Sequence, residues 1–211
     1  MLRLRHLLLS ACLLLVASLP VLSLAATEGK DYVRLADPIP TSSGHRIEVA
    51  EFFWYRCPHC FDLEPAFNTW IRLQPPSVAI RRIPAVLNQA WVPQAKAWYA
   101  MKTLGVTDRY HDLLFNAIHL DGLDSSSEMN LFAWAGRVGM NRTAFANAYH
   151  SFAVQVDVQR AAQLTRQSQI TGVPSFVVDG RYMTSVAMTG SESALFQTLS
   201  ALIEKVRKER Q

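Results

Sequence analysis

The chain has 211 residues, 50% of them hydrophobic and 18% charged, and can therefore bury one well-formed core in a single domain with room for an insertion. Its 21 basic residues nearly balance its 17 acidic ones, which argues against a nucleic-acid partner. Its 3 cysteines are too few for a framework of structural disulfides.

Residues 1–25 have the pattern of a cleaved secretory signal peptide. A basic start precedes the apolar run Leu7 to Leu22 and a small-residue cleavage site that ends at Ala25. The run is too short for the roughly 20 residues of a membrane span, and no charge cluster follows it. Cleavage also removes Cys12, which lies within the apolar run and is expected to be a small apolar filler.

The mature chain, from residue 26, begins with the pattern of an α/β unit. Short runs rich in β-branched and aromatic residues predict strands, and an amphipathic run between the second and third predicts a helix that ends before Pro75-Pro76. A right-handed crossover through this helix would make the two longer strands parallel. The predicted elements are an edge strand at Tyr32 to Leu35, a strand at Ile47 to Tyr55, a helix at Phe61 to Leu73 and a strand at Val78 to Ile83.

From residue 89 to residue 168 the pattern is helical throughout, and runs of β-branched residues are few. This contrast with the flanking segments predicts an all-helical subdomain inserted into an α/β domain. The predicted helices are Ala90 to Leu104, Thr107 to His119, one capped by Ser125 or Ser126 that runs to Val138, Arg142 to His150, and Val154 to Ser168.

The strand pattern returns at Pro174 to Val178. Asp179-Gly180 predicts a type I′ turn, and Arg181 to Thr184 the returning strand of a hairpin. Ser191 to Arg207 predicts an amphipathic helix that packs on the sheet. Residues 26–88 and 169–211 are therefore expected to form the α/β domain around the helical insertion 89–168.

The motif Cys57-Pro58-His59-Cys60 lies where a strand gives way to a helix. Two cysteines on a first helical turn are close enough to form and break a disulfide with little movement of the backbone. After leader cleavage they are the only thiols, and so small a loop stabilises a fold very little. The pair is therefore interpreted as a working redox centre, not a structural staple.

Each residue of the motif has an expected role. Cys57, at the helix N-terminus, is the candidate nucleophile because the free backbone N–H groups and the helix dipole favour its thiolate. Pro58 suits the first helical position. A protonated His59 would lower the pKa of Cys57 further, and its alternative is a solvent-facing turn residue. Cys60 is the candidate resolving cysteine. A stable thiolate makes the disulfide an oxidant.

Metal or haem binding is the main chemical alternative. Structural zinc needs about four ligands, but there is no second cysteine pair and the histidines lack ligand spacing. A c-type haem needs a histidine directly after the second cysteine, where this chain has Phe61. We therefore expect no metal and no cofactor other than the redox-active disulfide Cys57-Cys60.

These residues resemble the DsbA family of the thioredoxin superfamily. The resemblance is carried by Glu51-Phe52-Phe53, by the Cys57-Pro58-His59-Cys60 motif and by Gly172-Val173-Pro174, and it covers essentially the whole mature chain. It implies a thioredoxin-like fold with an inserted all-helical subdomain. It also implies that Pro174 is a cis-proline facing the cysteines, although periodicity alone would make it an ordinary strand-start proline. The backbone of Val173 would then pair with an extended substrate.

Glu51 lies in an apolar strand, where burial should raise its pKa. The resemblance implies a buried acid that relays a proton toward the resolving cysteine, and the alternative is an acid at the sheet margin facing solvent. Members of the family often have a lysine on the neighbouring strand, where this chain has Arg81 and Arg82. Arginine does not give up its proton at ordinary pH, so these residues are expected to tune charge and not to relay protons.

By this resemblance the chain is a periplasmic dithiol oxidase. It would donate its disulfide to newly exported, unfolded proteins through a mixed disulfide at Cys57, and a DsbB-like quinone-coupled inner-membrane protein would reoxidise it. A monomer is expected because no dimerisation domain is visible. Two alternatives remain, a disulfide isomerase or reductase, and a non-enzymatic peptide-binding chaperone whose disulfide is structural.

Overall fold

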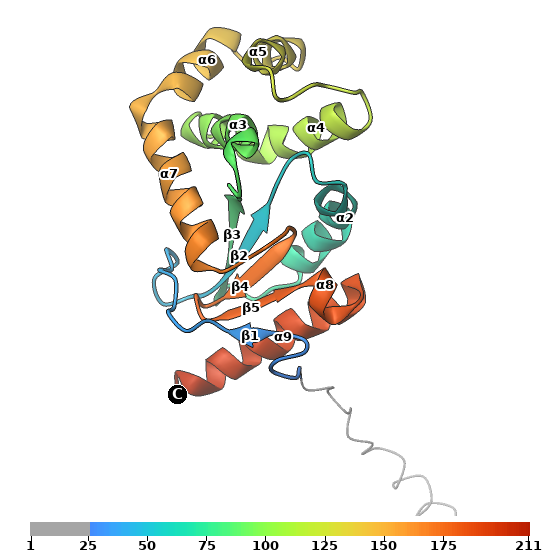
Figure 1. The fold of residues 1–211 in the computed structure, drawn as a ribbon, viewed down its shortest axis with the longest axis vertical. Coiled ribbons are helices and arrows are strands. Elements are labelled where there is room, and N and C mark those ends of the chain that lie inside the picture. Colours follow the sequence, from blue (N-terminus) through green and yellow to red (C-terminus); the bar gives the residue numbers. More distant parts are fainter. Residues whose placement is uncertain (1–25) are drawn as a thin grey trace, which may run out of the picture.

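The computed structural model describes residues 26–211 as a sheet flanked by helices (Figure 1). The expected signal peptide and Cys12 lie outside the described residues. Within the described range, none of the helices combines the length and apolar character needed to span a bilayer.

The sheet has 5 strands in the order β1-β5-β4-β2-β3. β2 and β3 are parallel, as the crossover helix between them predicts, and the other pairs are antiparallel. Both the edge strand and the hairpin predicted from the sequence are present. The strands are β1 (Val33–Arg34), β2 (Ile47–Phe53), β3 (Val78–Pro84), β4 (Ser175–Val178) and β5 (Tyr182–Ser185).

Helices account for most of the remaining chain. The helices α3 to α7 follow one another between β3 and β4. In Figure 1, α3 to α6 lie beyond one end of the sheet, and α7 runs from them down beside the sheet. The single-turn helix α8 has no counterpart among the predicted elements, because four residues are too few to produce a helical period. The helices are α2 (Pro58–Arg72), the 3-10 turn η1 (Gln89–Trp91), α3 (Val92–Thr103), α4 (Thr107–His119), α5 (Glu128–Arg137), α6 (Arg142–His150), α7 (Phe152–Gln167), α8 (Val186–Thr189) and α9 (Glu192–Glu209).

The predicted cap of α5 is wrong. Ser127, not Ser125 or Ser126, is the N-cap, and its side chain accepts a hydrogen bond from the backbone N–H of Asn130. Ser126 instead bonds to Asp124, and Ser125 is fully buried. Three consecutive serines are equivalent to a capping rule, and only tertiary packing chooses among them.

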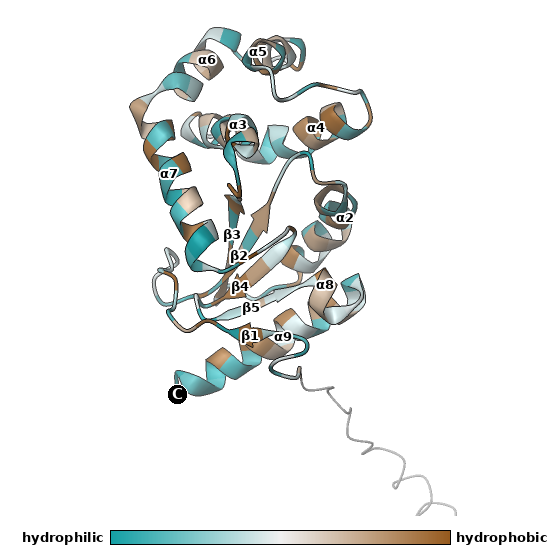
Figure 2. Cartoon of the chain, in the orientation of Figure 1, coloured by the Kyte–Doolittle hydropathy of each residue, from teal (hydrophilic) through white to brown (hydrophobic). Residues whose placement is uncertain are grey.

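The sheet separates two apolar cores. In β2, Val49 packs with α2 and α9, whereas Ala50 and Phe52 pack with the helices α3 to α7. Figure 2 shows β2 and β4 as mostly hydrophobic and the C-terminal end of α9 as hydrophilic. Because side chains alternate along a strand, Glu51 emerges on the same side as Val49, facing α2.

The β4–β5 hairpin has the turn that its sequence predicts. Asp179 and Gly180 have φ values of 55° and 68°, so both central residues are left-handed, as a type I′ turn requires. On α9, the apolar face is fully buried against the sheet.

Candidate active site

The two cysteines lie at the start of α2, immediately after β2. Cys57 is the N-cap, and its sulfur accepts a hydrogen bond from the backbone N–H of Cys60 at 3.3 Å. Pro58 occupies the first helical turn, where its missing N–H has no cost. Both cysteines are buried free thiols, while His59 is exposed.

The surroundings separate the two thiols by their pKa. The side chain of Cys60 donates a hydrogen bond to Cys57, and with help from nearby backbone N–H groups it lowers the pKa of Cys57 to about 7. The charge of His59 lowers this pKa as well, as the smallest of the contributions. Burial raises the pKa of Cys60 well above its usual value, and the Cys57 thiol adds to that effect. These opposite shifts favour the thiolate form of Cys57 and the thiol form of Cys60.

A distant segment completes this end of the sheet. The Val173-Pro174 peptide bond is cis, as the resemblance implied. The Cys57 thiol donates to the backbone carbonyl of Val173 at 3.4 Å, across 116 positions of sequence. The segment before β4 therefore lies directly against the cysteine with the lower pKa.

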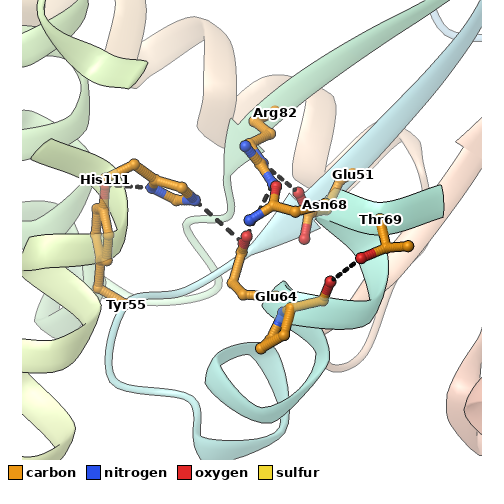
Figure 3. Close-up of polar contacts among 8 residues, drawn as sticks. Glu51, Tyr55, Glu64, Asn68, Thr69, Arg82 and His111 are labelled. Atoms are coloured by element: carbon orange, nitrogen blue, oxygen red, sulfur yellow. Dashed lines mark hydrogen bonds and ion pairs between the residues drawn. The ribbon is translucent and has the colours of Figure 1, made fainter. Parts of the chain in front are cut away.

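Glu51 is buried, with 1% of its surface exposed, so the sheet-margin alternative is wrong. It lies opposite Arg82 in the parallel register of β2 and β3, and Arg82 Nε donates to Glu51 Oε2 at 3.0 Å. The same guanidinium donates to Glu64 Oε2 at 2.8 Å and to Asn68 Oδ1 at 2.7 Å, both on α2 (Figure 3). Arg81 takes no part, because it pairs with Glu48 at 3.4 Å.

Glu51 and Glu64 share this one cation. Burial first, and then the charge of Glu64, raise the pKa of Glu51 to about 8 against the opposing effect of Arg82. Burial also raises the pKa of Glu64, to about 7. Two carboxyl groups beside a single guanidinium therefore hold a proton between them near neutral pH.

The buried polar contacts continue from Glu64 into the helical insertion. His111 on α4 contacts Glu64 Oε1 through Nε2 at 3.1 Å and the Tyr55 hydroxyl through Nδ1 at 2.7 Å (Figure 3). Burial lowers the pKa of His111 to about 3, so its ring is neutral. About two turns further along α4, His119 Nε2 donates to the backbone carbonyl of Tyr55 at 2.8 Å. Helix α4 thus holds Tyr55, two residues before Cys57, at both ends.

No functional role was predicted from the sequence for Glu64, His111 or Tyr55. Glu64 shares the buried face of α2 with Cys60 and Phe67, and a charged residue on an apolar helical face is a detectable signal. His111 likewise lies on the buried face of α4. Their meeting with β2 depends on how the insertion packs, which local periodicity does not encode.

One group of side chains has the composition of a metal site. Within residues 26–211, Glu64, His111 and Asp112 place one ligand atom each within 4.8 Å of one another. Both ring nitrogens of His111 already have partners, Tyr55 and Glu64. His111 and Glu64 of this group are therefore already joined in a hydrogen-bond network with Tyr55.

Aromatic side chains surround the cysteine pair. Trp54 stacks on Trp91 with ring centroids 4.2 Å apart, and its Nε1 donates to Gln94 Oε1 at 3.0 Å. Phe61 stacks on His119 with centroids 4.7 Å apart. These partly exposed rings offer apolar surface beside the thiols.

Comparison with known proteins places this geometry among thiol:disulfide interchange proteins. The family model for the DSBA-like thioredoxin domain matches residues 93–200. The thiol:disulfide interchange protein DsbA of Burkholderia cepacia is 35% identical over 184 residues, which cover 87% of this chain and 87% of the relative. DsbA of Pseudomonas aeruginosa is 33% identical over 206 residues, covering 96% of this chain and 97% of the relative.

Solved structures agree. The crystal structure of Pseudomonas aeruginosa DsbA superposes with a TM-score of 0.83 at 32% identity, covering 87% of this chain and 96% of the other. The oxidoreductase DsbA from Xylella fastidiosa has a TM-score of 0.81 at 28% identity, with 87% and 99% covered. The likeness therefore extends over the sheet and the helical insertion together.

Proposed function

Because the chain belongs to the DsbA family of thioredoxin-fold thiol:disulfide oxidoreductases, we propose that Cys57 and Cys60 are the pair through which it oxidises protein thiols. The observation that carries this assignment is the opposite shift in pKa of two cysteines one helical turn apart. A low pKa on the outer thiol and a high one on the inner thiol are what an asymmetric disulfide donor needs.

In the proposed reaction a substrate thiolate attacks the Cys57 sulfur of the oxidised pair. The Cys57–Cys60 bond breaks, a mixed disulfide forms at Cys57, and Cys60 leaves as a thiolate that takes up a proton. A second substrate thiolate then attacks its partner sulfur in the mixed disulfide, which releases Cys57 as a thiolate. The substrate loses two electrons and gains a disulfide, and the pair is reduced to the dithiol.

The direction of exchange follows from the leaving group. Release of Cys57 is favourable because the hydrogen bonds that it accepts stabilise the thiolate over the thiol. Stabilising the reduced form in this way makes the disulfide a stronger oxidant. The exposed imidazole of His59 adds to the same effect.

Two further residues support the exchange. Glu51 is suited to supply the proton that Cys60 takes up, because its raised pKa keeps it protonated near neutral pH and its charge state acts on Cys60. The backbone of Val173, in contact with the Cys57 sulfur, is placed to pair with an extended substrate chain before β4. Pro174 follows Val173 and immediately precedes β4.

The substrates that we propose are newly exported, unfolded proteins in the periplasm, reached after removal of residues 1–25. Each turnover leaves the pair reduced, so a reoxidising partner is needed. A DsbB-like quinone-coupled protein of the inner membrane fits that need in this family. The disulfide itself would be the only redox group that the protein carries.

The test measures disulfide transfer from the oxidised protein to a reduced, unfolded substrate. Transfer is monitored as the loss of free thiols from the substrate. We expect Cys57→Ala to reduce transfer to background. Cys60→Ala has no disulfide to donate, but its Cys57 thiolate is expected to attack a substrate that contains a disulfide, release one substrate thiolate and remain trapped in a mixed disulfide, because Cys60 is no longer there to resolve it. These two variants are matched, because each removes one sulfur from the same helical turn. Transfer that survives Cys57→Ala would refute the assignment.

A redox titration against glutathione separates the alternatives. An oxidase is expected to be less stable in its oxidised form than in its reduced form. An oxidised form that is the more stable one would favour a reductase or isomerase. A peptide-binding chaperone with a structural disulfide would prevent substrate aggregation equally well in the Cys57→Ala variant.

A further inference from the structure

We propose that His111 is a positioning residue for the redox centre: its Nε2–H holds Glu64 as the ionised member of the buried carboxyl pair, so that the shared proton resides on Glu51. This inference rests on the proposed function only for its link to thiol chemistry. The chain of contacts that carries it runs from Tyr55 through His111, Glu64 and Arg82 to Glu51.

The tautomer of His111 is determined by Tyr55. Within residues 26–211 the buried Tyr55 hydroxyl has the Nδ1 atom of His111 as its hydrogen-bond partner, at 2.7 Å. A buried hydroxyl that lost its acceptor would be costly, so the O–H donates and Nδ1 accepts. A neutral imidazole that accepts at Nδ1 carries its proton on Nε2. His111 therefore donates to Glu64 Oε1, at 3.1 Å.

Donation from His111 favours the carboxylate form of Glu64. A hydrogen bond to a charged group changes an ionisation constant by roughly tenfold or more. Glu51 has no second donor of this kind among the described contacts, and Arg82 is shared by both acids. A hydrogen bond with Asn68 also favours ionisation of Glu64, in the same direction as the donor from His111. Asp112, next to His111 on α4, opposes ionisation of Glu64, so the donor from His111 acts against a nearby negative charge.

The two acids also differ in their access to water. Glu64 lines a cavity of about 670 Å³ between α2 and α4, together with Asp62, Asn68 and Asp112. Glu51 is closed off beneath Arg82, with 1% of its surface exposed. An ionised Glu64 thus lies on the solvent side and a protonated Glu51 on the interior side. This order gives a proton a path from the cavity through the acid pair.

The consequence reaches Cys60. A negative charge on Glu51 disfavours the Cys60 thiolate. When Cys60 leaves as a thiolate, a neutral Glu51 can give it a proton, whereas an ionised Glu51 can only repel it. By keeping the proton on Glu51, His111 would assist release of Cys60 without touching either sulfur.

The experiment is a pH titration of the Glu51 and Glu64 side-chain carboxyl groups by carbon NMR, on reduced full-length protein with isotope-labelled glutamate. Glu51→Gln and Glu64→Gln assign the two signals. His111→Leu removes the donor, and His111→Gln keeps an N–H near the Nε2 position. His45→Leu, at an exposed loop position, is the matched control.

In the unaltered protein Glu64 is expected to ionise at lower pH than Glu51. His111→Leu should raise the pH at which Glu64 ionises and abolish most of this separation, His111→Gln should preserve it, and the control should leave it unchanged. An unchanged separation in a folded His111→Leu variant would overturn the proposal, as would its loss in His111→Gln. If His111→Leu does not fold, Tyr55→Phe, which frees the tautomer, should bring the two ionisations closer together, and an unchanged separation refutes the idea.

Disulfide transfer by the same variants tests the link to the thiols. His111→Leu is expected to slow transfer at neutral pH by roughly tenfold, the size of the change in ionisation. His111→Gln should restore most of the rate. If His111→Leu abolishes the separation but transfer does not require Cys57, the proposed function fails while the effect of His111 on Glu64 stands.

Discussion

Replacement of Glu51 by glutamine should make the protein progressively more stable, relative to the unaltered chain, as pH rises. The folded state raises the pKa of Glu51 from 4.5 to about 8, chiefly because the group is buried. An acid whose pKa is raised on folding contributes its full stability below about pH 4.5 and loses it as pH rises through about 8. Glutamine has the same shape and never ionises, so the variant escapes this loss.

The size of the effect follows from the shift. Each pKa unit corresponds to about 1.4 kcal/mol, so an unshared shift of this size is worth about 5 kcal/mol. Glu64 shares the proton and Arg82 remains as a counter-ion, which reduces the figure. We expect the free energy of unfolding of Glu51→Gln, minus that of the unaltered protein, to rise by about 2–4 kcal/mol between about pH 5 and about pH 9.

Urea unfolding over a series of pH values measures this difference. Both proteins should also carry Cys57→Ser and Cys60→Ser, so that thiol titration does not enter the comparison. An exposed acid, Glu192, provides the control as Glu192→Gln, for which the difference should stay flat. A flat difference for Glu51→Gln as well would show that Glu51 is not held protonated, and the proton-relay argument would fail.

Two further predictions follow from the same structure. His59→Ser should raise the pKa of Cys57 from about 7 by only a fraction of a unit, measured from the ultraviolet absorbance of the thiolate, because the hydrogen bond from Cys60 is the larger cause; a rise to the ordinary cysteine value would contradict this ranking. Gly180→Ala should cost about 3 kcal/mol or more in urea unfolding, since a Cβ there would lie 2.1 Å from the backbone oxygen of Ile39. Its control Gly190→Ala, which is also left-handed but meets nothing within 4 Å, should cost about 1 kcal/mol, and equal losses would refute the steric argument.

Local pattern was enough to predict most elements of this fold. Helices α4 and α6 have the residue ranges predicted for them. Each consists of good helix-forming residues and has a clear signal at its ends. The parallel pairing of β2 with β3 follows from a single crossover helix. Errors arise where the signal is degenerate, as in the run of serines before α5, or too short to have a period, as in α8.

The candidate site also has features that the local sequence predicts and features that it does not. Cys57, Cys60 and the burial of Glu51 could be inferred from the chain, because two thiols one helical turn apart and an acid in an apolar strand are local features. The partner of Glu51 could not be settled, since Arg81 and Arg82 are adjacent in sequence. Strand alternation turns them to opposite faces, and only the register with β2 puts Arg82 opposite Glu51.

The sequence by itself determined that two cysteines lie one helical turn apart at a helix N-terminus, because helix geometry depends on residues close together in the chain. Tertiary structure decided what surrounds that pair. Val173 reaches the Cys57 sulfur from 116 positions away, and His111 reaches Glu64 from another helix. Contacts between segments far apart in sequence depend on how layers pack, and no local periodicity encodes that packing.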